Sequence, residues 1–206
     1  MSSTTWWIGS AVLLTAAVVM LGFALSNHSR SLPGPVSTVT VKVPRPPKRP
    51  LVTNFSVPRS LSIPSLGIHA KLVKLGLNGD GTVQVPKNTS QPGWYHFGPS
   101  PGQSGSAVIL GHVDSFHGPG IFFKLRTLVP GRHIEVSLAD GKRAIFIVTA
   151  VQTFLKSSFP TERVYGSHGY AELQLVTCGG VFNPRTGSYE SNIIVFSVLN
   201  RVFSGV

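Results

Sequence analysis

The hydrophobic positions divide the chain into two unlike parts. Residues 6–25 (WWIGSAVLLTAAVVMLGFAL) run without a charge, whereas from residue 60 onward short apolar segments alternate with turn residues. Twenty apolar residues, at ~1.5 Å per helical residue, match a hydrocarbon core of ~30 Å and predict one membrane-spanning helix. Short β-branched segments bounded by Gly, Pro, Asn and Asp are typical of strands.

A cleaved signal peptide is the alternative for this apolar run. The run is longer than the apolar region of a signal peptide, no basic region precedes it, and no clear A-x-A site follows, so a retained anchor within residues 1–27 is favoured. The basic residues follow the run, and the positive-inside rule alone would place the carboxyl side in the cytoplasm. A position outside the cell for the rest of the chain conflicts with that rule, and the sequence leaves this conflict open.

Residues 28–59 are predicted to form a stiff basic spacer. The segment holds seven prolines and six Lys or Arg, and no acidic residue occurs before Asp80. Proline at this density favours extended, polyproline-like backbone over packed structure. The charge would be attracted to anionic lipid headgroups or wall polymers. Nucleic acid is not expected as a partner, because neither aromatic interleaving nor a recognised binding fold accompanies the charge.

Residues 60–206 are predicted to form one mostly β domain. Two hairpins are indicated by apolar segments around Asn-Gly or Asp-Gly turns, over residues 68–86 and 133–154. The other expected elements are a helical turn and three strands, over residues 121–128, 106–112, 171–178 and 189–199. Short connections between so many strands favour a closed or nearly closed barrel of about seven to eight strands with short helices, since closure removes exposed edges.

Composition supports this β prediction and limits the chemistry. Of 206 residues, 22 are Gly, 16 are Pro and only 12% are charged, which disfavours a helical bundle or a coiled coil. The single Cys excludes an internal disulfide. The net charge of +11 is uneven, because residues 1–79 carry eight Lys or Arg and no Asp or Glu. The charge therefore belongs mostly to the appendage and less to the folded domain.

Three residues at the ends of predicted strands carry candidate chemistry. Cys178 ends the apolar segment LQLVT, His112 ends AVILG, and Arg185 lies in the loop NPRTG. Each alone is ordinary, because a free Cys is most often a buried inert hydrophobe, and a lone His or Arg is usually structural or solvated. Together they supply a thiol nucleophile, an imidazole that accepts its proton, and a guanidinium that stabilises an oxyanion.

The segments around these residues resemble the sortases, the membrane-anchored cysteine transpeptidases of Gram-positive bacteria. LVTCGG at residues 175–180 is similar to the family's Thr-x-Thr-Cys segment, with Leu175 where Thr is frequent, and ILGHVDS at residues 109–115 is similar to its His segment. Longer stretches resemble class F and the neighbouring class E, namely WYHFGPSPGQSGSAVILGHVDS, GPGIFFKL, FPTERVYG and VTCGGVFNPRTGSY. The resemblance covers about residues 60–200.

The resemblance implies a sortase-like barrel that cleaves a Leu-Pro-x-Thr-Gly type of sorting signal on secreted proteins. Cys178 would be the nucleophile, His112 the acid/base partner, and Arg185 the candidate for substrate and oxyanion stabilisation. A thioester would pass to an amine of a cell-wall precursor or a pilin Lys, outside the membrane and without a cofactor or metal. Better-known classes place their Arg within the last strand, roughly where this chain has residues 189–192, none of which is basic.

Three neighbouring residues are expected to support the site. Asp114 lies two positions after His112, so in extended backbone it shares a face with the imidazole and can orient it; a solvated role or a turn hydrogen bond is the alternative. Thr177 can shape the pocket, although a strand would point it away from Cys178. Gly179 offers a backbone N–H to the oxyanion if the Arg points elsewhere.

Other functions are weaker on the same residues. Zinc binding by the H-x-D-x-x-H run at residues 112–117, joined by Cys178, is disfavoured because that spacing is not an established ligand pattern. Serine hydrolase chemistry through Ser106 or Ser115 lacks a G-x-S-x-G elbow. The L,D-transpeptidases, which also use a Cys, have a Ser-His-Gly-Cys type of signature that is absent here. A catalytically silent, wall-associated peptide-binding module on the same barrel stays the main alternative.

Overall fold

A computed structural model describes residues 56–204 of the chain. The apolar run at residues 6–25 and nearly all of the basic spacer lie outside the described residues, so the predictions for them stay predictions. Within residues 56–204, none of the helices is both long enough and apolar enough to cross a bilayer.

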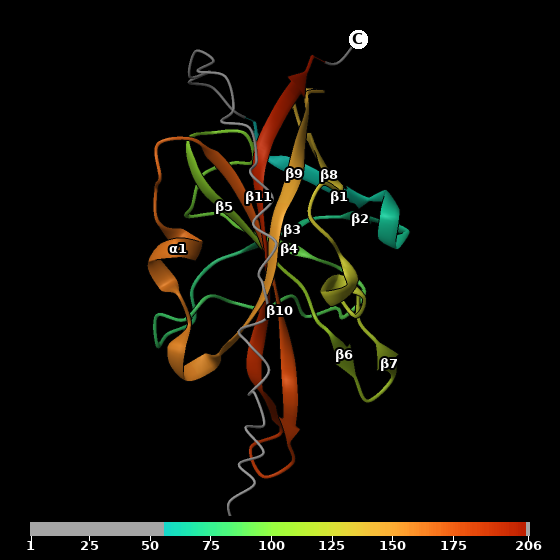
Figure 1. The fold of residues 1–206 in the computed structure, drawn as a ribbon, viewed down its shortest axis with the longest axis vertical. Helices are drawn as coiled ribbons and strands as arrows, with labels where there is room; N and C mark the ends of the chain where they lie inside the picture. The colour runs from blue at the N-terminus through green and yellow to red at the C-terminus, as the bar shows by residue number, and fades with distance from the viewer. Residues whose placement is uncertain (1–55, 205–206) are drawn as a thin grey trace, which may run out of the picture. The chain divides into compact units, whose positions relative to one another are not determined.

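Nine strands form one mixed sheet, and a separate pair of short strands lies beside it (Figure 1). The sheet contains β1 (Pro58–Ile63), β2 (Ile68–Lys71), β3 (Val73–Leu75), β4 (Gly93–Tyr95), β5 (Gly105–Leu110), β8 (His133–Leu138), β9 (Arg143–Leu155), β10 (Ala171–Asn183) and β11 (Ser188–Phe203). The strand order across the sheet is β2-β1-β8-β9-β11-β10-β5-β4-β3. The separate hairpin consists of β6 (Asp114–Ser115) and β7 (Gly118–Pro119). The helical elements are short: η1 (Pro64–Leu66), η2 (Leu125–Thr127), η3 (Lys156–Ser158) and α1 (Thr161–Tyr165).

The two edges of the sheet are consecutive in sequence. β2 and β3 occupy opposite edges, and Leu72 alone separates them. The Leu72 N–H donates to Arg59 O at 2.8 Å, and the Val73 N–H donates to Pro92 O at 3.1 Å, so adjacent residues hold both sides of the sheet. The sheet therefore curls into a nearly closed barrel, as the sequence predicts, and leaves little unpaired edge.

Two buried apolar clusters lie on opposite faces of this sheet. Ile109 and Leu175 belong to the larger cluster, whereas their neighbours Val108 and Val176 belong to the smaller one. Successive residues of a strand point to opposite faces, so this alternation separates a barrel interior from an outer face. The outer cluster includes Val164 of α1, which packs against β5. The outer face of β5 and β10 is thus covered along part of its length.

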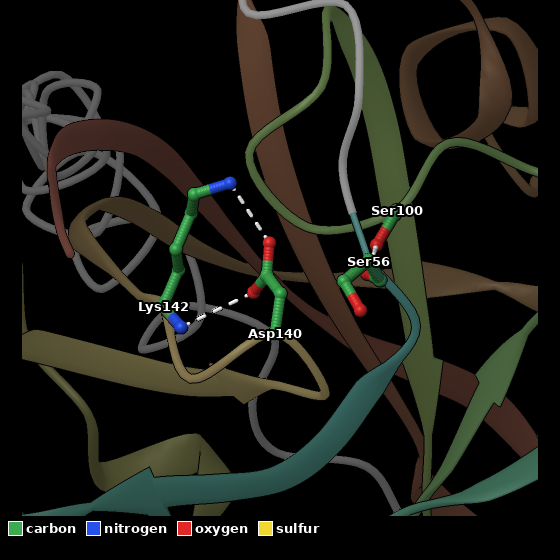
Figure 2. A network of polar contacts seen from close by, with 4 residues as sticks. All are labelled: Ser56, Ser100, Asp140 and Lys142. Carbon is green, nitrogen blue, oxygen red and sulfur yellow. Dashed lines mark hydrogen bonds and ion pairs between the residues drawn. The ribbon is translucent and has the colours of Figure 1, made fainter. Parts of the chain in front are cut away.

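The hairpin expected over residues 133–154 is confirmed as β8 and β9. Its turn is held by Asp140, which accepts from the Lys142 N–H at 3.1 Å and from Lys142 Nζ at 2.8 Å (Figure 2). Gly141 follows with φ of 82°, a left-handed conformation that favours glycine. The sequence signal was local here, because an Asp-Gly turn fixes the register of its own strands.

The hairpin expected over residues 68–86 forms only next to its turn. β2 pairs with β1 and β3 pairs with β4, and only a Leu77–Val83 bridge joins the two halves. The Gln84 side chain forms hydrogen bonds with backbone groups that could otherwise pair with another strand. Its Oε1 accepts from the Gly76 N–H at 2.9 Å, and its Nε2 donates to Leu77 O at 3.2 Å. Side-chain bonds of this kind compete with strand pairing.

The strand count also exceeds the seven to eight expected, because β1 and several two- or three-residue strands were not foreseen. β1 begins at Pro58, at the end of the segment that was predicted to be a spacer. Just before it, Ser100 Oγ donates to Ser56 O at 2.6 Å, which ties the chain to the barrel from the first described residue (Figure 2). The strands expected over residues 171–178 and 189–199 are present and longer, as β10 and β11.

Candidate active site

The structure brings His112 and Cys178 to the same end of two neighbouring parallel strands. β5 and β10 pair in parallel, with Ile109 opposite Leu175 and Leu110 opposite Val176, and the Gly111 N–H continues the ladder to Val176 O at 3.2 Å. Cys178 and His112 each follow the last paired residues of these strands by two positions. Cys178 shares the face of Val176, which belongs to the outer cluster, whereas His112 lies just past the end of β5.

The imidazole of His112 is oriented by a backbone carbonyl. Its Nε2 lies 2.7 Å from Pro86 O. A carbonyl oxygen can only accept, so in this hydrogen bond Nε2 carries the proton, and Nδ1 is the nitrogen that can take up another. The loop before β4 therefore selects one tautomer of the candidate base.

Two glycines let the backbone around His112 pack closely. A Cβ on Gly111 would lie 2.6 Å from Cδ2 of the buried Phe122, and a Cβ on Gly120 would lie 2.4 Å from His112 O. The Phe122 N–H donates to that same oxygen at 2.9 Å. Segment 120–122 thus clamps the main chain of His112 at the end of β5.

Replacing Gly120 by Ala is expected to lower the free energy of unfolding by ~1–3 kcal/mol, because the new methyl group would overlap the His112 carbonyl. Chemical denaturation followed by circular dichroism measures this. Gly79→Ala is the matched control, because a Cβ on Gly79 meets no atom within 4 Å. Equal losses of stability in the two variants would show that the clamp is not tight.

Cys178 is a free, half-buried thiol in β10. Two glycines follow it, and a side chain at either position would require neighbours on β11 to move: a Cβ on Gly179 would lie 2.6 Å from Ile193 Cδ1, and one on Gly180 would lie 2.7 Å from Ser191 Oγ. Gly180 has φ of 78°, and the pairing with β11 shifts register between Gly179 and Phe182. Such a bulge re-aims the strand directly after the thiol.

Thr177 is buried on the other face of β10, as its place in the strand predicts. It lies opposite Ile193, and its Oγ1 is a buried hydroxyl without a hydrogen-bond partner among the described residues. It therefore faces the barrel interior, and any influence on the site passes through packing beneath Cys178.

Asp114 takes its hydrogen bond from Tyr189, a residue for which the sequence suggested no role. The Tyr189 hydroxyl donates to Asp114 Oδ2, which links β11 to the short strand after His112. That bond, followed by burial and the nearby charges of Asp114 and Cys178, raises the pKa of Tyr189. Between residues 56 and 204, no hydrogen bond joins Asp114 to the His112 ring. Tyr189 thus borders the thiol as a neutral donor.

Arg185 is not brought to this pair. It lies exposed in the turn that joins β10 to β11, where its N–H donates to Asn183 Oδ1 at 3.0 Å. Asn183 is five residues beyond Cys178, which corresponds to ~16 Å of strand at ~3.3 Å per residue. Figure 1 shows the far end of this hairpin projecting past the rest of the sheet. The sequence spacing alone suggested a shorter separation.

Alternative chemistries find little support in the described part of the chain. Residues 56–204 contain no group of three His, Cys, Asp or Glu side chains that could hold a metal ion. Ser106 is buried and donates to Glu172 Oε2 at 3.2 Å, and His168 Nδ1 lies 2.5 Å from the same oxygen. The carboxylate sits between the hydroxyl and the imidazole, so this trio lacks the serine–histidine contact of a hydrolase.

Comparison of the chain with known proteins identifies the family to which its sequence is similar. A family model described as Sortase domain matches residues 61–200, which is more than half of the chain. No curated protein matches the chain.

Several solved structures share the fold at low sequence identity. Sortase A from Corynebacterium diphtheriae is 18% identical with a TM-score of 0.55, over 71% of this chain and 61% of that one. Listeria monocytogenes sortase A is 14% identical with a TM-score of 0.55, over 74% of this chain and 92% of that one. Sortase C1 from Streptococcus agalactiae is 19% identical with a TM-score of 0.54, over 68% and 66%.

These structures include sortases of both the A and C types, so they assign the fold without assigning a class. The present chain spans 61% of the Corynebacterium chain. With its sortase domain matched over residues 61–200 and its nearly closed barrel shared with solved sortases, this chain belongs to the sortase family.

Proposed function

We propose that this chain is a cysteine transpeptidase that cleaves a Leu-Pro-x-Thr-Gly type of sorting signal and joins the new carboxyl end to an amine. The observation that supports the proposal is the parallel pairing of β5 and β10, because Cys178 and His112 each follow the last paired residues of these strands by two positions. A thiol and an imidazole in this relation are the minimal pair for nucleophilic attack on a carbonyl. The family model supports the same chemistry.

In the first half of the reaction, Cys178 loses its proton to His112 and its sulfur attacks the Thr carbonyl carbon. The carbonyl electron pair moves onto the oxygen and gives a tetrahedral oxyanion. Collapse of this intermediate re-forms the carbonyl and breaks the Thr–Gly bond, and the departing amine takes the proton held by His112. The product is a thioester on Cys178 and a free Gly peptide.

In the second half, an acceptor amine attacks the thioester carbonyl. His112 accepts a proton from that amine, and Cys178 leaves as thiolate and then regains its proton. The new amide bond replaces the thioester, so no oxidant or reductant is required. Arg185 enters this proposal as a candidate group for substrate contact from the β10–β11 turn, and Gly179 as a candidate backbone donor to the oxyanion.

The proposed setting is the extracellular face of the cell membrane. A retained helix within residues 1–27 would hold the chain in the bilayer, residues 28–59 would act as the spacer, and residues 60–206 would be the catalytic domain. The substrates would be secreted proteins with a C-terminal sorting signal, and the acceptor a lipid-linked wall precursor or a pilin Lys. The quoted motifs favour class F, with class E as its neighbour.

A catalytically silent peptide-binding module is the second candidate. The observation that favours it is Arg185, the one predicted catalytic side chain that lies exposed at the hairpin turn, away from the thiol. A silent module would bind an extended peptide on the same face without breaking it.

A transpeptidation assay separates the two candidates. The full chain in detergent is incubated with a Leu-Pro-x-Thr-Gly peptide and an excess of an amine, and the products are separated by chromatography. We expect a Gly-terminated leaving peptide and a Thr–amine ligation product in equal amounts. Peptide binding by calorimetry together with unchanged peptide would instead establish the silent module.

A further inference from the structure

Asn192 is the residue directly across from Cys178 on the neighbouring strand. β10 and β11 are antiparallel, and their register pairs Cys178 with Asn192. Residues directly opposite in such a pair point to the same face, with Cβ atoms ~4.5–5.5 Å apart. The outer face therefore carries Cys178 on β10 and Asn192 on β11, next to β5, which His112 follows two residues after its last paired position.

The Asn192 amide has an unused polar atom. Its Oδ1 is buried and lacks a hydrogen-bond partner among the described residues. A buried amide atom left without a partner costs ~1–3 kcal/mol, so stability alone gives no reason for an Asn here. The oxygen therefore does not tie the side chain to the rest of the fold, and the register with Cys178 places the amide, with its two N–H donors, on the strand beside the nucleophile.

The side chain has the chemistry that a peptide carbonyl requires. A carboxamide offers two N–H donors and one acceptor, which complement the C=O and N–H of an extended backbone. An Asn amide is an established type of oxyanion donor, and in one serine protease its removal costs about 10²–10³ in kcat. Its place directly across from Cys178 puts such a donor beside the nucleophile.

Neither Arg beyond Cys178 is placed to do this. Arg185 lies in the exposed turn at the hairpin end. Arg201 lies nine residues past Asn192 on β11, with its guanidinium over the Phe203 ring at 4.9 Å from the centroid. The residue across from Cys178 is therefore a neutral Asn and not an Arg.

We propose that Asn192 is a catalytic residue whose side-chain amide donates a hydrogen bond to the oxyanion formed when Cys178 attacks the sorting signal. This inference rests on the proposed transpeptidase function. The bond changes at the reacting carbon are those given above, and Asn192 adds only an N–H···O⁻ hydrogen bond that strengthens as the carbonyl oxygen gains charge. An uncharged amide stabilises this oxygen without greatly altering the resting thiol.

Two rates measured on the full-length protein test the proposal. The first is acyl-enzyme formation from a Leu-Pro-x-Thr-Gly peptide, and the second is alkylation of Cys178 by iodoacetamide, a substitution that builds no oxyanion. Asn192→Ala is expected to lower kcat for acylation by about 10²–10³ while KM and the alkylation rate change by less than about threefold. Loss of both rates would overturn the proposal, because it would mean that Asn192 maintains the site or the thiol.

A second variant covers the case in which Asn192→Ala does not fold. Asn192→Leu keeps a similar size and removes the unpartnered polar atom, so it is expected to be at least as stable as the wild type and to acylate as slowly as the Ala variant. Normal acylation by this folded variant would overturn the proposal.

The control is Asn200→Ala, which replaces an exposed residue of β11. It is expected to acylate within about threefold of the wild type. Arg185→Ala is measured beside it as the competing candidate. A hundredfold loss in Arg185→Ala together with normal rates in Asn192→Ala would return the oxyanion role to the Arg. If the wild type is alkylated but never acylated, the transpeptidase function itself is refuted. If the wild type is acylated and Asn192→Ala is acylated equally fast, only the role of Asn192 is refuted.

Discussion

Replacing Cys178 by Ala is expected to abolish acyl-enzyme formation and transpeptidation, with a loss of at least about 10⁴ in turnover. The physical reason is that the chain contains a single sulfur nucleophile, since Cys178 is its only Cys. The nearest hydroxyl in the same strand, that of Thr177, is buried on the opposite face and cannot replace it. Chromatography of the peptide products over several hours measures the remaining rate.

The Cys178→Ala variant is expected to keep its fold and its affinity for the peptide. The thiol is half-buried, so its removal leaves only a small change in packing. Circular dichroism and calorimetric titration with the uncleaved peptide provide the control. Measurable peptide cleavage by the folded variant would show that another group performs the attack.

Replacing His112 by Ala is expected to lower turnover by about 10²–10⁴, the range for loss of a general acid–base group. The imidazole removes the thiol proton and later protonates the leaving amine, so its loss slows two steps of acylation. Its ring is held by Pro86 O through Nε2, which leaves Nδ1 for these transfers. Steady-state kinetics with the peptide and an amine measures the loss.

His117→Ala is the matched control, because His117 lies exposed in the nearby β6–β7 turn. That variant is expected to keep wild-type turnover, and free imidazole is expected to restore part of the activity of His112→Ala. Equal activity in His112→Ala and His117→Ala would remove His112 from the reaction. A loss in both variants would indicate that the turn, and not the imidazole, supports the site.

The strands that lead to the thiol and the imidazole could be predicted because both signals are local. Each residue ends a continuous apolar segment that must be a buried strand, and strand ends are where side chains reach solvent. The family motifs around Cys178 and His112 then suggested that the two ends meet. The parallel pairing of β5 with β10 brings the two segment ends to the same end of the sheet.

The residues that the sequence did not reveal depend on pairing across strands. Asn192 gains its place from the antiparallel register with β10, and Tyr189 from the bulge after Gly179 that shifts the last part of that register. The hydrophobic pattern of a single strand predicts neither a bulge nor a register offset against its neighbour. The separation of Arg185 from the thiol has the same cause, because β10 continues past Cys178 as a projecting hairpin.

The sequence predicted a barrel of many short strands, but it did not show which residues join the two edges of the sheet. Alternating segments and turn residues indicated many short strands, yet the link between the two edges consists of Leu72 and its hydrogen-bonded neighbours. The error over residues 68–86 follows from the same region, because the Gln84 side chain occupies backbone groups of Gly76 and Leu77. Tertiary contacts of this kind override local strand preference.

The most direct test of the account is the mass of the full-length protein after a brief incubation with a Leu-Pro-x-Thr-Gly peptide, followed by proteolytic mapping of the adduct. We predict an increase equal to the acyl part of the peptide, located on the fragment that contains Cys178 and removed by hydroxylamine. An unchanged protein mass under conditions where the peptide is bound, or an adduct on any other residue, would contradict the claim that this thiol carries the reaction.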